Sequence, residues 1–177
     1  MLRMAIVGVG WAGTRHAQAI QELSRDVIVE CLVDRDPEHL MAKAREWGVA
    51  KTYVDYEDAL ADPDVDAVSI CSPHPLHCPQ AIFAAEAGKH ILVEKPMALT
   101  VEEATRMIDA VATHGVKLYV AENVCYTPMS ETLRQIVRTG QYIGELTFAC
   151  MTKGFRATEY GYPGRRAWLS TPDEGGT

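Results

Sequence analysis

The sequence has no surplus of positive charge. Its 177 residues include 17 lysines and arginines against 24 aspartates and glutamates, which gives a formal net charge of −7. A general nucleic-acid binder neutralises phosphates with a basic face, so this balance argues against that class of function. The sequence also has no basic run of the kind that binds an anionic membrane surface.

Long apolar runs are missing as well. No segment approaches about 18 consecutive apolar residues, so the sequence predicts no membrane span. The apolar run MAIVGV (4–9) is interrupted by glycine and leads into a polar stretch with helical spacing. We interpret it as a buried first strand rather than as the core of a signal peptide.

The sequence contains few cysteines, and their number is odd. The five cysteines are scattered along the chain, without the spacing of a small disulfide-bonded scaffold. We therefore expect free thiols in a reducing compartment, and hence a cytoplasmic protein. The sequence contains neither an internal repeat nor a low-complexity segment.

Short apolar runs alternate with amphipathic stretches over the first two thirds of the chain. We predict strands at 4–9, 27–33, 51–54, 66–71, 90–94 and 116–121, and helices at 12–23, 37–48, 56–61, 76–87 and 100–114. Strands that are apolar on both faces belong to a parallel sheet with helices on both sides. Right-handed crossovers make such a sheet doubly wound, so we predict an α/β protein with a Rossmann-type fold.

The pattern changes after about residue 122. A helix is predicted at 128–139 and a half-exposed strand at 144–154. We predict a Rossmann domain at residues 1–121 and the start of a second, α+β domain at 122–177, which is too short for a complete core of its own. Two interpretations of the tail remain equally open. Its side chains either belong to a solvated loop or contact the cofactor or substrate, and they are Arg156, Tyr160, Arg165, Arg166 and Trp168.

The turn after the first predicted strand contains a GxGxxG pattern, GVGWAG. Its strand–turn–helix context favours a dinucleotide-binding turn, although the pattern alone is a weak signal. Gly8 permits the tight turn, Gly10 leaves room for a pyrophosphate, and Gly13 lets the helix and the strand approach closely. Trp11 and Ala12 open the helix, whose free N–H groups and dipole favour phosphates. The alternative is a glycine-rich turn with only a packing role.

Asp34 ends the second predicted strand, about 20 residues after the glycine pattern, where a ribose-binding carboxylate is expected. Such a carboxylate accepts hydrogen bonds from the ribose hydroxyls and repels a 2′-phosphate, which favours NAD over NADP. Arg35 leaves NADP possible, because an arginine there can hold a 2′-phosphate or stack on adenine. An ordinary turn residue is the alternative for Asp34.

The tripeptide Glu94-Lys95-Pro96 follows the fifth predicted strand. The carboxyl ends of strands line the ligand crevice of this fold, so we expect Lys95 to bring a cation there. That cation could polarise a carbonyl group or hydrogen-bond a hydroxyl group. The Lys95–Pro96 peptide bond could be cis. A surface lysine in a turn is the alternative.

These stretches, in this order, resemble one family. The chain is similar to the N-terminal part of the glucose–fructose oxidoreductase / inositol dehydrogenase (Gfo/Idh/MocA) family in VGVGWAGTRHAQAI (7–20), LVDRDPE (32–38), DAVSICSPHPLHCPQAIFAAEAGKHILVEKPMALT (66–100) and AENVCYTP (121–128). GKHILVEKP is the most specific part, and the resemblance covers essentially the whole chain.

The resemblance implies an NAD(P)-dependent oxidoreductase that acts on sugars, polyols or related compounds. It implies that the cofactor lies on the glycine turn with Asp34 at its ribose, and that Lys95 belongs to the catalytic centre. It also implies a homo-oligomer for the full-length protein. The other residues that it places beside the cofactor are Ser72, Pro73, His74, His77, Glu94 and Asn123.

One departure from the family pattern bears on activity. Family members have an Asp-x-Gly-x-x-His or Asp-x-Gly-x-His segment in the second domain, whose histidine transfers the proton. That segment normally follows a glycine-rich stretch like the final Glu174-Gly175-Gly176-Thr177. We therefore expect a fragment of a longer enzyme, able to bind cofactor without turning over substrate.

The stretch CSPHPLHCPQ holds four potential soft-metal ligands, namely Cys71, His74, His77 and Cys78. Cys71 would end a buried strand, two prolines stiffen the loop, and His77 and Cys78 are adjacent, so we predict no metal site. We expect His74 and His77 to face the cofactor crevice instead. His16 is expected to be a packed helix residue rather than a ligand.

Two classes of function remain open. The first is a dehydrogenase that transfers a hydride between a nicotinamide and a hydroxyl-bearing carbon of a small sugar, cyclitol or related polyol. NAD-dependent glycoside hydrolysis is a variant of this class. The second class is a non-catalytic dinucleotide-binding module or sensor.

Overall fold

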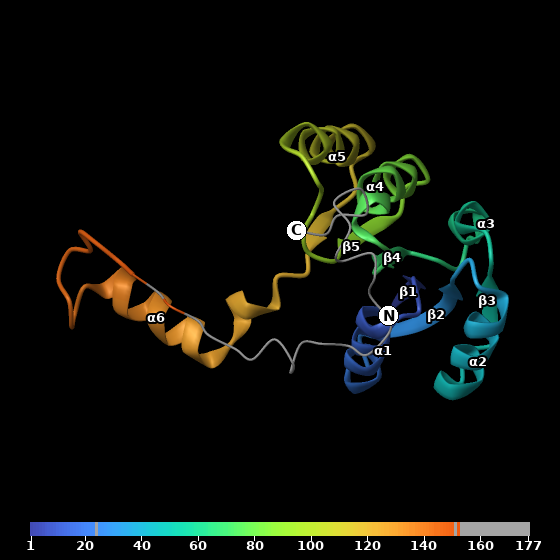
Figure 1. Cartoon of the computed structure of the whole chain (residues 1–177), viewed down its shortest axis with the longest axis horizontal. Coiled ribbons are helices and arrows are strands. Elements are labelled where there is room, and N and C mark those ends of the chain that lie inside the picture. The colour runs from blue at the N-terminus through green and yellow to red at the C-terminus, as the bar shows by residue number, and fades with distance from the viewer. Residues whose placement is uncertain (24, 151, 153–177) are drawn as a thin grey trace.

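The structure is a computed structural model that describes residues 1–23, 25–150 and 152. In it, the protein forms one open parallel sheet (Figure 1). The strand order is β3-β2-β1-β4-β5-β6, and every neighbouring pair is parallel. The strands are β1 (Leu2–Val7), β2 (Val27–Val33), β3 (Lys51–Tyr53), β4 (Ala67–Ile70), β5 (His90–Val93) and β6 (Leu118–Val120). This order confirms the predicted Rossmann-type fold and places its switch point between β1 and β4.

Helices cover both faces of the sheet. Figure 1 shows α4 (His77–Glu86) and α5 (Val101–His114) on one side, with α1 (Trp11–Glu22) and α2 (Pro37–Trp47) on the other. The short α3 (Tyr56–Ala61) contributes Ala59 and Leu60 to the core on the α4 side. Alternate residues of β1 face opposite layers, because side chains alternate along a strand. Ala5 and Val7 belong to the α4 side, and Met4 and Ile6 to the α1 side.

The helix ends follow local sequence signals. The Thr100 hydroxyl accepts a hydrogen bond from the Glu103 backbone N–H and begins α5, which confirms the predicted capping signal. Asp36 caps α2 in the same way, and Pro37 occupies the first helical turn. Gly48 and Gly115 end α2 and α5 in the left-handed conformation, which glycine adopts without steric cost.

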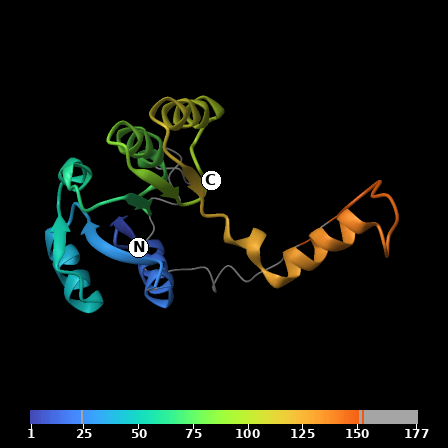
Figure 2. The ribbon, with the colours of Figure 1, turned by 180° about the vertical axis from the view of Figure 1, so that it is seen from behind.

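The chain leaves the sheet after β6. A short 3₁₀ helix, η2 (Asn123–Tyr126), leads into α6 (Pro128–Thr139), which has no buried residue. Figures 1 and 2 both show α6 standing clear of the sheet. The predicted domain boundary at residue 121 falls where this departure begins, and the division into two domains stays a prediction.

The strand predicted at 144–154 does not form in the described part of that stretch. Residues 144–150 and 152 are not in a strand, since a half-apolar alternation becomes a strand only beside a partner that supplies hydrogen bonds. The remaining residues of the stretch, and the five aromatic and arginine side chains singled out in the tail, lie outside the described residues. Among the helices that the structure describes, none is long and apolar enough to cross a membrane.

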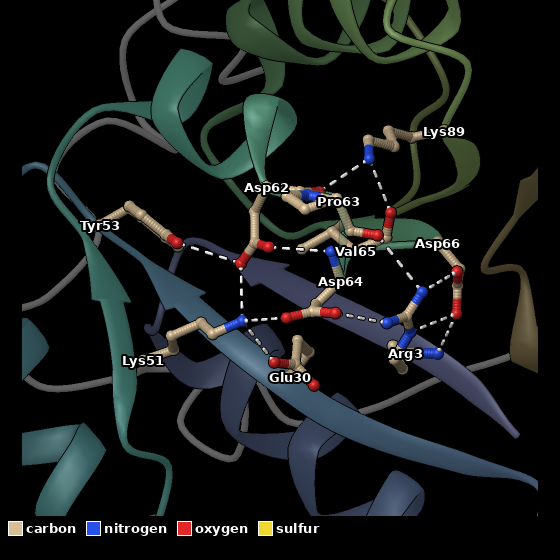
Figure 3. Close-up of polar contacts among 10 residues, drawn as sticks. All are labelled: Arg3, Glu30, Lys51, Tyr53, Asp62, Pro63, Asp64, Val65, Asp66 and Lys89. Atoms are coloured by element: carbon tan, nitrogen blue, oxygen red, sulfur yellow. Dashed lines mark hydrogen bonds and ion pairs between the residues drawn. The ribbon is translucent and has the colours of Figure 1, made fainter.

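A network of ion pairs ties the amino ends of the strands together (Figure 3). Arg3 of β1 contacts Asp64 and Asp66 at 2.7 and 2.9 Å, in the loop that precedes β4. The Lys51 ammonium contacts Asp64 at 3.0 Å and also Glu30 and Asp62. Lys89 donates to the carbonyl oxygens of Asp62 and Val65 from the residue before β5. These residues hold the edge of the sheet opposite the crevice.

We predict that Asp66 contributes stability that depends on pH. Its hydrogen bonds to the Arg3 side chain and backbone lower the pKa of its carboxyl group to about 2. The unfolded-state pKa lies near about 3.9, so this contribution is present above that pH and is lost as the pH falls toward 2. In urea unfolding, Asp66→Asn should destabilise the protein at pH 6, and its difference from the wild type should shrink by pH 2.5.

The exposed Asp109 of α5 offers a matched control. Asp109→Asn should leave the free energy of unfolding at pH 6 close to that of the wild type. A difference for Asp66→Asn that stays constant from pH 6 to pH 2.5 would contradict the assigned role of the Arg3–Asp66 pair.

Candidate active site

The glycine turn joins β1 to α1 at the switch point. Gly8 has a φ of +90°, and a Cβ atom there would lie 2.8 Å from the Cys71 carbonyl oxygen. A Cβ atom at Gly13 would lie 2.1 Å from the Gly8 carbonyl oxygen. Both positions therefore require glycine, because the backbone itself occupies the space.

Gly10 differs from the other two glycines of the turn. Among the described residues, no atom lies within 4 Å of a Cβ atom built on it, and no side chain there caps the helix that begins at Trp11. The first turn of α1 therefore presents backbone N–H groups toward open space beside Gly10, which is where a phosphate fits. Trp11 is half exposed, and the guanidinium of Arg15 lies 5.7 Å from its ring centroid. Ala12, the next residue, is partly buried.

Asp34 directly follows β2 and holds the glycine turn in place. One carboxylate oxygen accepts a hydrogen bond from the Val9 N–H at 3.0 Å, and the other accepts one from the Asp36 N–H, also at 3.0 Å. Each carboxylate oxygen has a second lone pair, so Asp34 can still accept hydrogen bonds from ribose hydroxyls. Arg35 beside it is exposed. The contact with Val9 is a role that the sequence did not indicate.

The loop after β4 lies against the same edge of the sheet. The Ser72 hydroxyl donates to the Gln80 side-chain oxygen at 2.5 Å. Pro73 and His74 are partly exposed, and the rings of His74 and His77 meet edge to face with centroids 5.5 Å apart. This loop therefore reaches the crevice with Ser72, Pro73 and His74 partly accessible.

His77 does not face the crevice, which corrects our expectation for its side chain. It is fully buried, and its ring nitrogens lie 2.8 Å from the Pro96 carbonyl oxygen and 2.9 Å from the Ser72 carbonyl oxygen. Burial lowers the pKa of His77, and a neutral ring has one N–H, so it donates to one carbonyl at a time. The ring connects the loop after β4 to the segment after β5.

The four candidate metal ligands of the CSPHPLHCPQ stretch point in different directions. The buried Cys78 sulfur lies 3.6 Å from the Glu103 carbonyl oxygen under α5, whereas the His77 ring contacts Pro96 and Ser72. The Cys71 sulfur lies 3.6 Å from the Ser69 hydroxyl. Among the described residues, no group of three metal-binding side chains converges.

Lys95 follows β5 at the carboxyl edge of the sheet, and its side chain is exposed. The Lys95–Pro96 peptide bond is cis, as the sequence suggested. Glu94 is partly buried, and its Oε2 accepts a hydrogen bond from the Lys95 backbone N–H at 3.0 Å. The crevice therefore contains the exposed ammonium group of Lys95, and the Glu94 side chain holds the backbone of that residue in place.

His16 of α1 contacts Glu94 from the other side of the crevice. Its Nε2 lies 3.2 Å from Glu94 Oε1, and its Nδ1 lies 2.7 Å from the Ser69 hydroxyl. Burial lowers the pKa of the His16 imidazolium, but hydrogen bonds and charges from Cys71 and Glu94 outweigh burial and raise that pKa to about 10. For Glu94, burial raises the pKa, and the contacts with His16 and Lys95 lower it overall. The pair is therefore ionic at neutral pH.

The sequence missed this contact. It indicated only that His16 lies on the packed face of α1, at helical spacing from Ile20, and the residue is indeed partly buried there. Asn123 stands apart from these side chains. It is exposed at the start of η2, and no hydrogen bond in the described structure connects it to the glycine turn or to Lys95.

An open parallel sheet with a glycine turn at its switch point defines a dinucleotide-binding protein. Residues 2–122 match the Gfo/Idh/MocA family, which is described as an oxidoreductase family with an NAD-binding Rossmann fold. The chain belongs to this family, which confirms the resemblance seen in the sequence and the predicted class of cofactor.

The chain is similar to several dehydrogenases. It is 34% identical over 150 residues to the levoglucosan dehydrogenase of Pseudarthrobacter phenanthrenivorans, across 78% of this chain and 37% of that protein. The structure resembles that of scyllo-inositol dehydrogenase from Lactobacillus casei with bound NAD(H) and scyllo-inositol. The TM-score is 0.75 at 28% sequence identity, across 80% of this chain and 42% of that one.

Another relative has a different activity in its name. The chain is 32% identical over 154 residues to a glycosyl hydrolase family 109 protein of Shewanella baltica, across 82% of this chain and 33% of that protein. The chain spans about two fifths of the length of the curated relatives that it matches.

We predict that two glycine substitutions will separate folding from nucleotide binding. Gly13→Ala should destabilise the protein, because its Cβ atom would meet the Gly8 carbonyl oxygen. Gly10→Ala should change the free energy of unfolding by less than about 1 kcal/mol, since its Cβ atom meets open space. Gly10→Ala should nevertheless weaken NADH binding about tenfold or more, because the methyl group occupies the space for the pyrophosphate.

Urea unfolding and a fluorescence titration with NADH measure the two effects. Gly115→Ala is unsuitable as a control, because its left-handed φ strains any side chain. Ala42→Gly, on the outer face of α2, offers a helix substitution away from the turn. If Gly10→Ala binds NADH as tightly as the wild type, the assignment of the pyrophosphate to this turn is wrong.

Proposed function

We propose that this chain provides the cofactor-binding part of an NAD(P)-dependent dehydrogenase that acts on a sugar, cyclitol or related polyol. The observation on which this proposal rests is the exposed Lys95 at the same sheet edge as the glycine turn. The two lie after β5 and β1, which are separated in the sheet only by β4. Ligands of open α/β sheets bind in the crevice at this position.

The geometry supports a division of labour among the residues. The first turn of α1 offers N–H groups to the pyrophosphate beside Gly10, and Asp34 offers acceptors to the adenosine ribose. Ser72, Pro73 and His74 line the neighbouring loop, while His77 fixes that loop from behind. We infer that NAD is preferred, with NADP possible because of Arg35.

In the reacting part of the crevice, Lys95 orients the substrate oxygen. Its ammonium group donates a hydrogen bond to the hydroxyl that becomes a carbonyl, and stabilises negative charge that develops on that oxygen. A bound nicotinamide would accept the hydride from the carbon that bears the hydroxyl group, and the hydroxyl proton would pass to a base, for which the family resemblance implies a histidine of the second domain. Asn123 and Glu94 remain proposed neighbours of the nicotinamide.

Hydrolysis of a glycoside is the second candidate, favoured by the similarity to the glycosyl hydrolase family 109 protein. The same crevice and the same lysine would serve a hydride that is returned to the sugar within one cycle. Such a reaction releases sugar without net formation of NADH. Free-sugar analysis therefore separates it from a dehydrogenase, and binding of NADH without either product indicates a non-catalytic module.

The cellular setting and the assembly also remain proposals. All five cysteines are free in the structure, which supports a reducing, cytoplasmic environment. Exposed apolar side chains on α6, namely Met129, Leu133 and Val137, are compatible with a covered surface in a homo-oligomer. The implied substrate is small, and the acidic net charge of −7 gives no support to a nucleic-acid partner.

We predict that Lys95→Ala will separate binding from turnover. Lys95 contacts the reacting oxygen and not the adenosine half of the cofactor, so NADH affinity should stay within about threefold of the wild type. In the longer enzyme that the family resemblance implies, with the second domain included, absorbance at the NADH band with a panel of polyols should show turnover lowered about 100-fold or more for any polyol that the wild type oxidises.

Lys117 is the matched control, because it is an exposed lysine that precedes β6 at the opposite edge of the sheet. Lys117→Ala should leave both binding and turnover unchanged. Unchanged turnover in Lys95→Ala would rule out its catalytic role.

We predict that Asp34→Asn will shift the preference between the two dinucleotides. The amide oxygen can still accept the Val9 N–H, so the glycine turn should keep its shape, whereas the bond from the Asp36 N–H is lost and the charge that repels a 2′-phosphate is gone. The ratio of the Kd for NADPH to the Kd for NADH should fall about tenfold or more. Asp58→Asn, at an exposed position of α3, should leave the ratio unchanged. The same ratio in both variants would contradict the placement of Asp34 at the ribose.

A further inference from the structure

The His16–Glu94 contact connects three elements at the crevice. His16 belongs to α1, Glu94 follows β5, and Ser69 lies in β4 between them. The His16 and Glu94 side chains are mostly buried, with 15% and 19% of their surfaces exposed. Ser69 is fully buried. A polar cluster this far from water persists only when its members satisfy one another's hydrogen bonds.

A His16 ring that is protonated on both nitrogens can donate a hydrogen bond to each of its partners. Its Nε2–H donates to the Glu94 carboxylate, which only accepts when ionised, and its Nδ1–H donates to the Ser69 oxygen. The Ser69 hydroxyl hydrogen is then available to the Cys71 sulfur. The titratable groups that act on the ring are Cys71, directly after β4, and Glu94, directly after β5. Lys95 acts on Glu94 rather than on the ring.

Glu94 is held at both of its oxygens. His16 contacts Oε1, and the Lys95 backbone N–H donates to Oε2. The carboxylate is thus turned toward the backbone and toward α1. Among the described residues, no carboxylate forms an ion pair with the Lys95 ammonium, although Glu94 is its neighbour in sequence. A neighbouring glutamate without such contacts would be free to pair with that ammonium group.

We propose that His16 is a positioning residue that, as an imidazolium, holds the Glu94 carboxylate on the Lys95 backbone and so keeps the Lys95 ammonium available to the substrate. This inference deepens the proposed function and rests on it for the role of Lys95. His16 touches neither the reacting oxygen nor the nicotinamide in this role. It acts through Glu94 on the direction and the charge environment of the lysine.

The location of His16 also connects the lysine to the cofactor turn. The residue lies one turn of α1 beyond Gly13, the glycine that fixes how closely the helix approaches β1. How closely α1 packs on the sheet therefore determines whether the His16 ring reaches Glu94. The cofactor would bind at the amino end of this same helix. One rigid helix would therefore position the phosphates of the cofactor and, through His16 and Glu94, the catalytic lysine.

The test measures how readily the Lys95 amine reacts. Trace labelling of the 177-residue chain with acetic anhydride, followed by mass spectrometry, gives the acetylation rate of Lys95 relative to that of Lys117 in the same sample. In His16→Gln the freed Glu94 carboxylate should pair with the ammonium and lower this ratio about threefold, the scale of an exposed ion pair. His114→Gln, an exposed histidine on α5, should leave the ratio unchanged.

A double variant distinguishes this cause from a general disturbance. His16→Gln combined with Glu94→Gln removes the carboxylate that would capture the ammonium, so the labelling ratio should return close to that of the wild type. A double variant that stays as slow as His16→Gln overturns the proposal. So does an unchanged ratio in a folded His16→Gln protein.

The charge on His16 is measured independently, which keeps the test decisive even if His16→Gln does not fold. In nitrogen-15 NMR spectra at pH 8, both His16 ring nitrogens should carry protons in the wild type, and one should lose its proton in Glu94→Gln. A neutral His16 in the wild type at this pH would overturn the proposal. Failure of the chain to bind NADH would instead count against the proposed function, and would leave the labelling and NMR results to be judged separately.

Discussion

The close approach of helix α1 to the end of strand β1 is the contact on which the rest of the crevice depends. A Cβ atom at Gly13 would lie 2.1 Å from the Gly8 carbonyl oxygen, so the helix can sit at this depth only with glycine there. At this depth the His16 ring reaches Ser69 and Glu94 on the far side of the switch point. The same depth leaves the amino end of the helix open beside Gly10.

The features that the sequence predicted are local ones. Apolar periodicity gave the order of strands and helices, and the GxGxxG pattern placed Gly8, Gly10 and Gly13 at the first turn. Thr100 marked the start of α5 because a cap and its partner lie within one helical turn. Right-handed crossovers then convert a list of elements into one sheet order, so the fold followed without knowledge of any tertiary contact.

The features that the sequence did not predict join residues that are far apart in it. His16 and Glu94 meet only because α1 packs on β1, β2 and β4, and β4 is the neighbour of the strand that Glu94 follows; the pattern of α1 showed no more than a packed face. The bond from Val9 to Asp34 depends in the same way on the pairing of β1 with β2. Residues 144–150 were predicted to be part of a strand because apolar and polar residues alternate there, and they do not form one. Alternation indicates which face would be apolar, but a strand also needs a neighbouring strand to bond with.

Two histidines near the crevice show how partners, rather than residue type, decide a role. Both His16 and His77 are buried enough for burial to favour the neutral ring. His77 has only carbonyl oxygens beside its nitrogens, and burial prevails, so it serves as a neutral bridge between two loops. His16 has the Cys71 sulfur and the Glu94 carboxylate beside it, and together these two groups outweigh burial and raise its pKa. The charged imidazole of His16 thus restrains the carboxylate that lies next to Lys95, whereas the uncharged imidazole of His77 is buried behind the loop after β4.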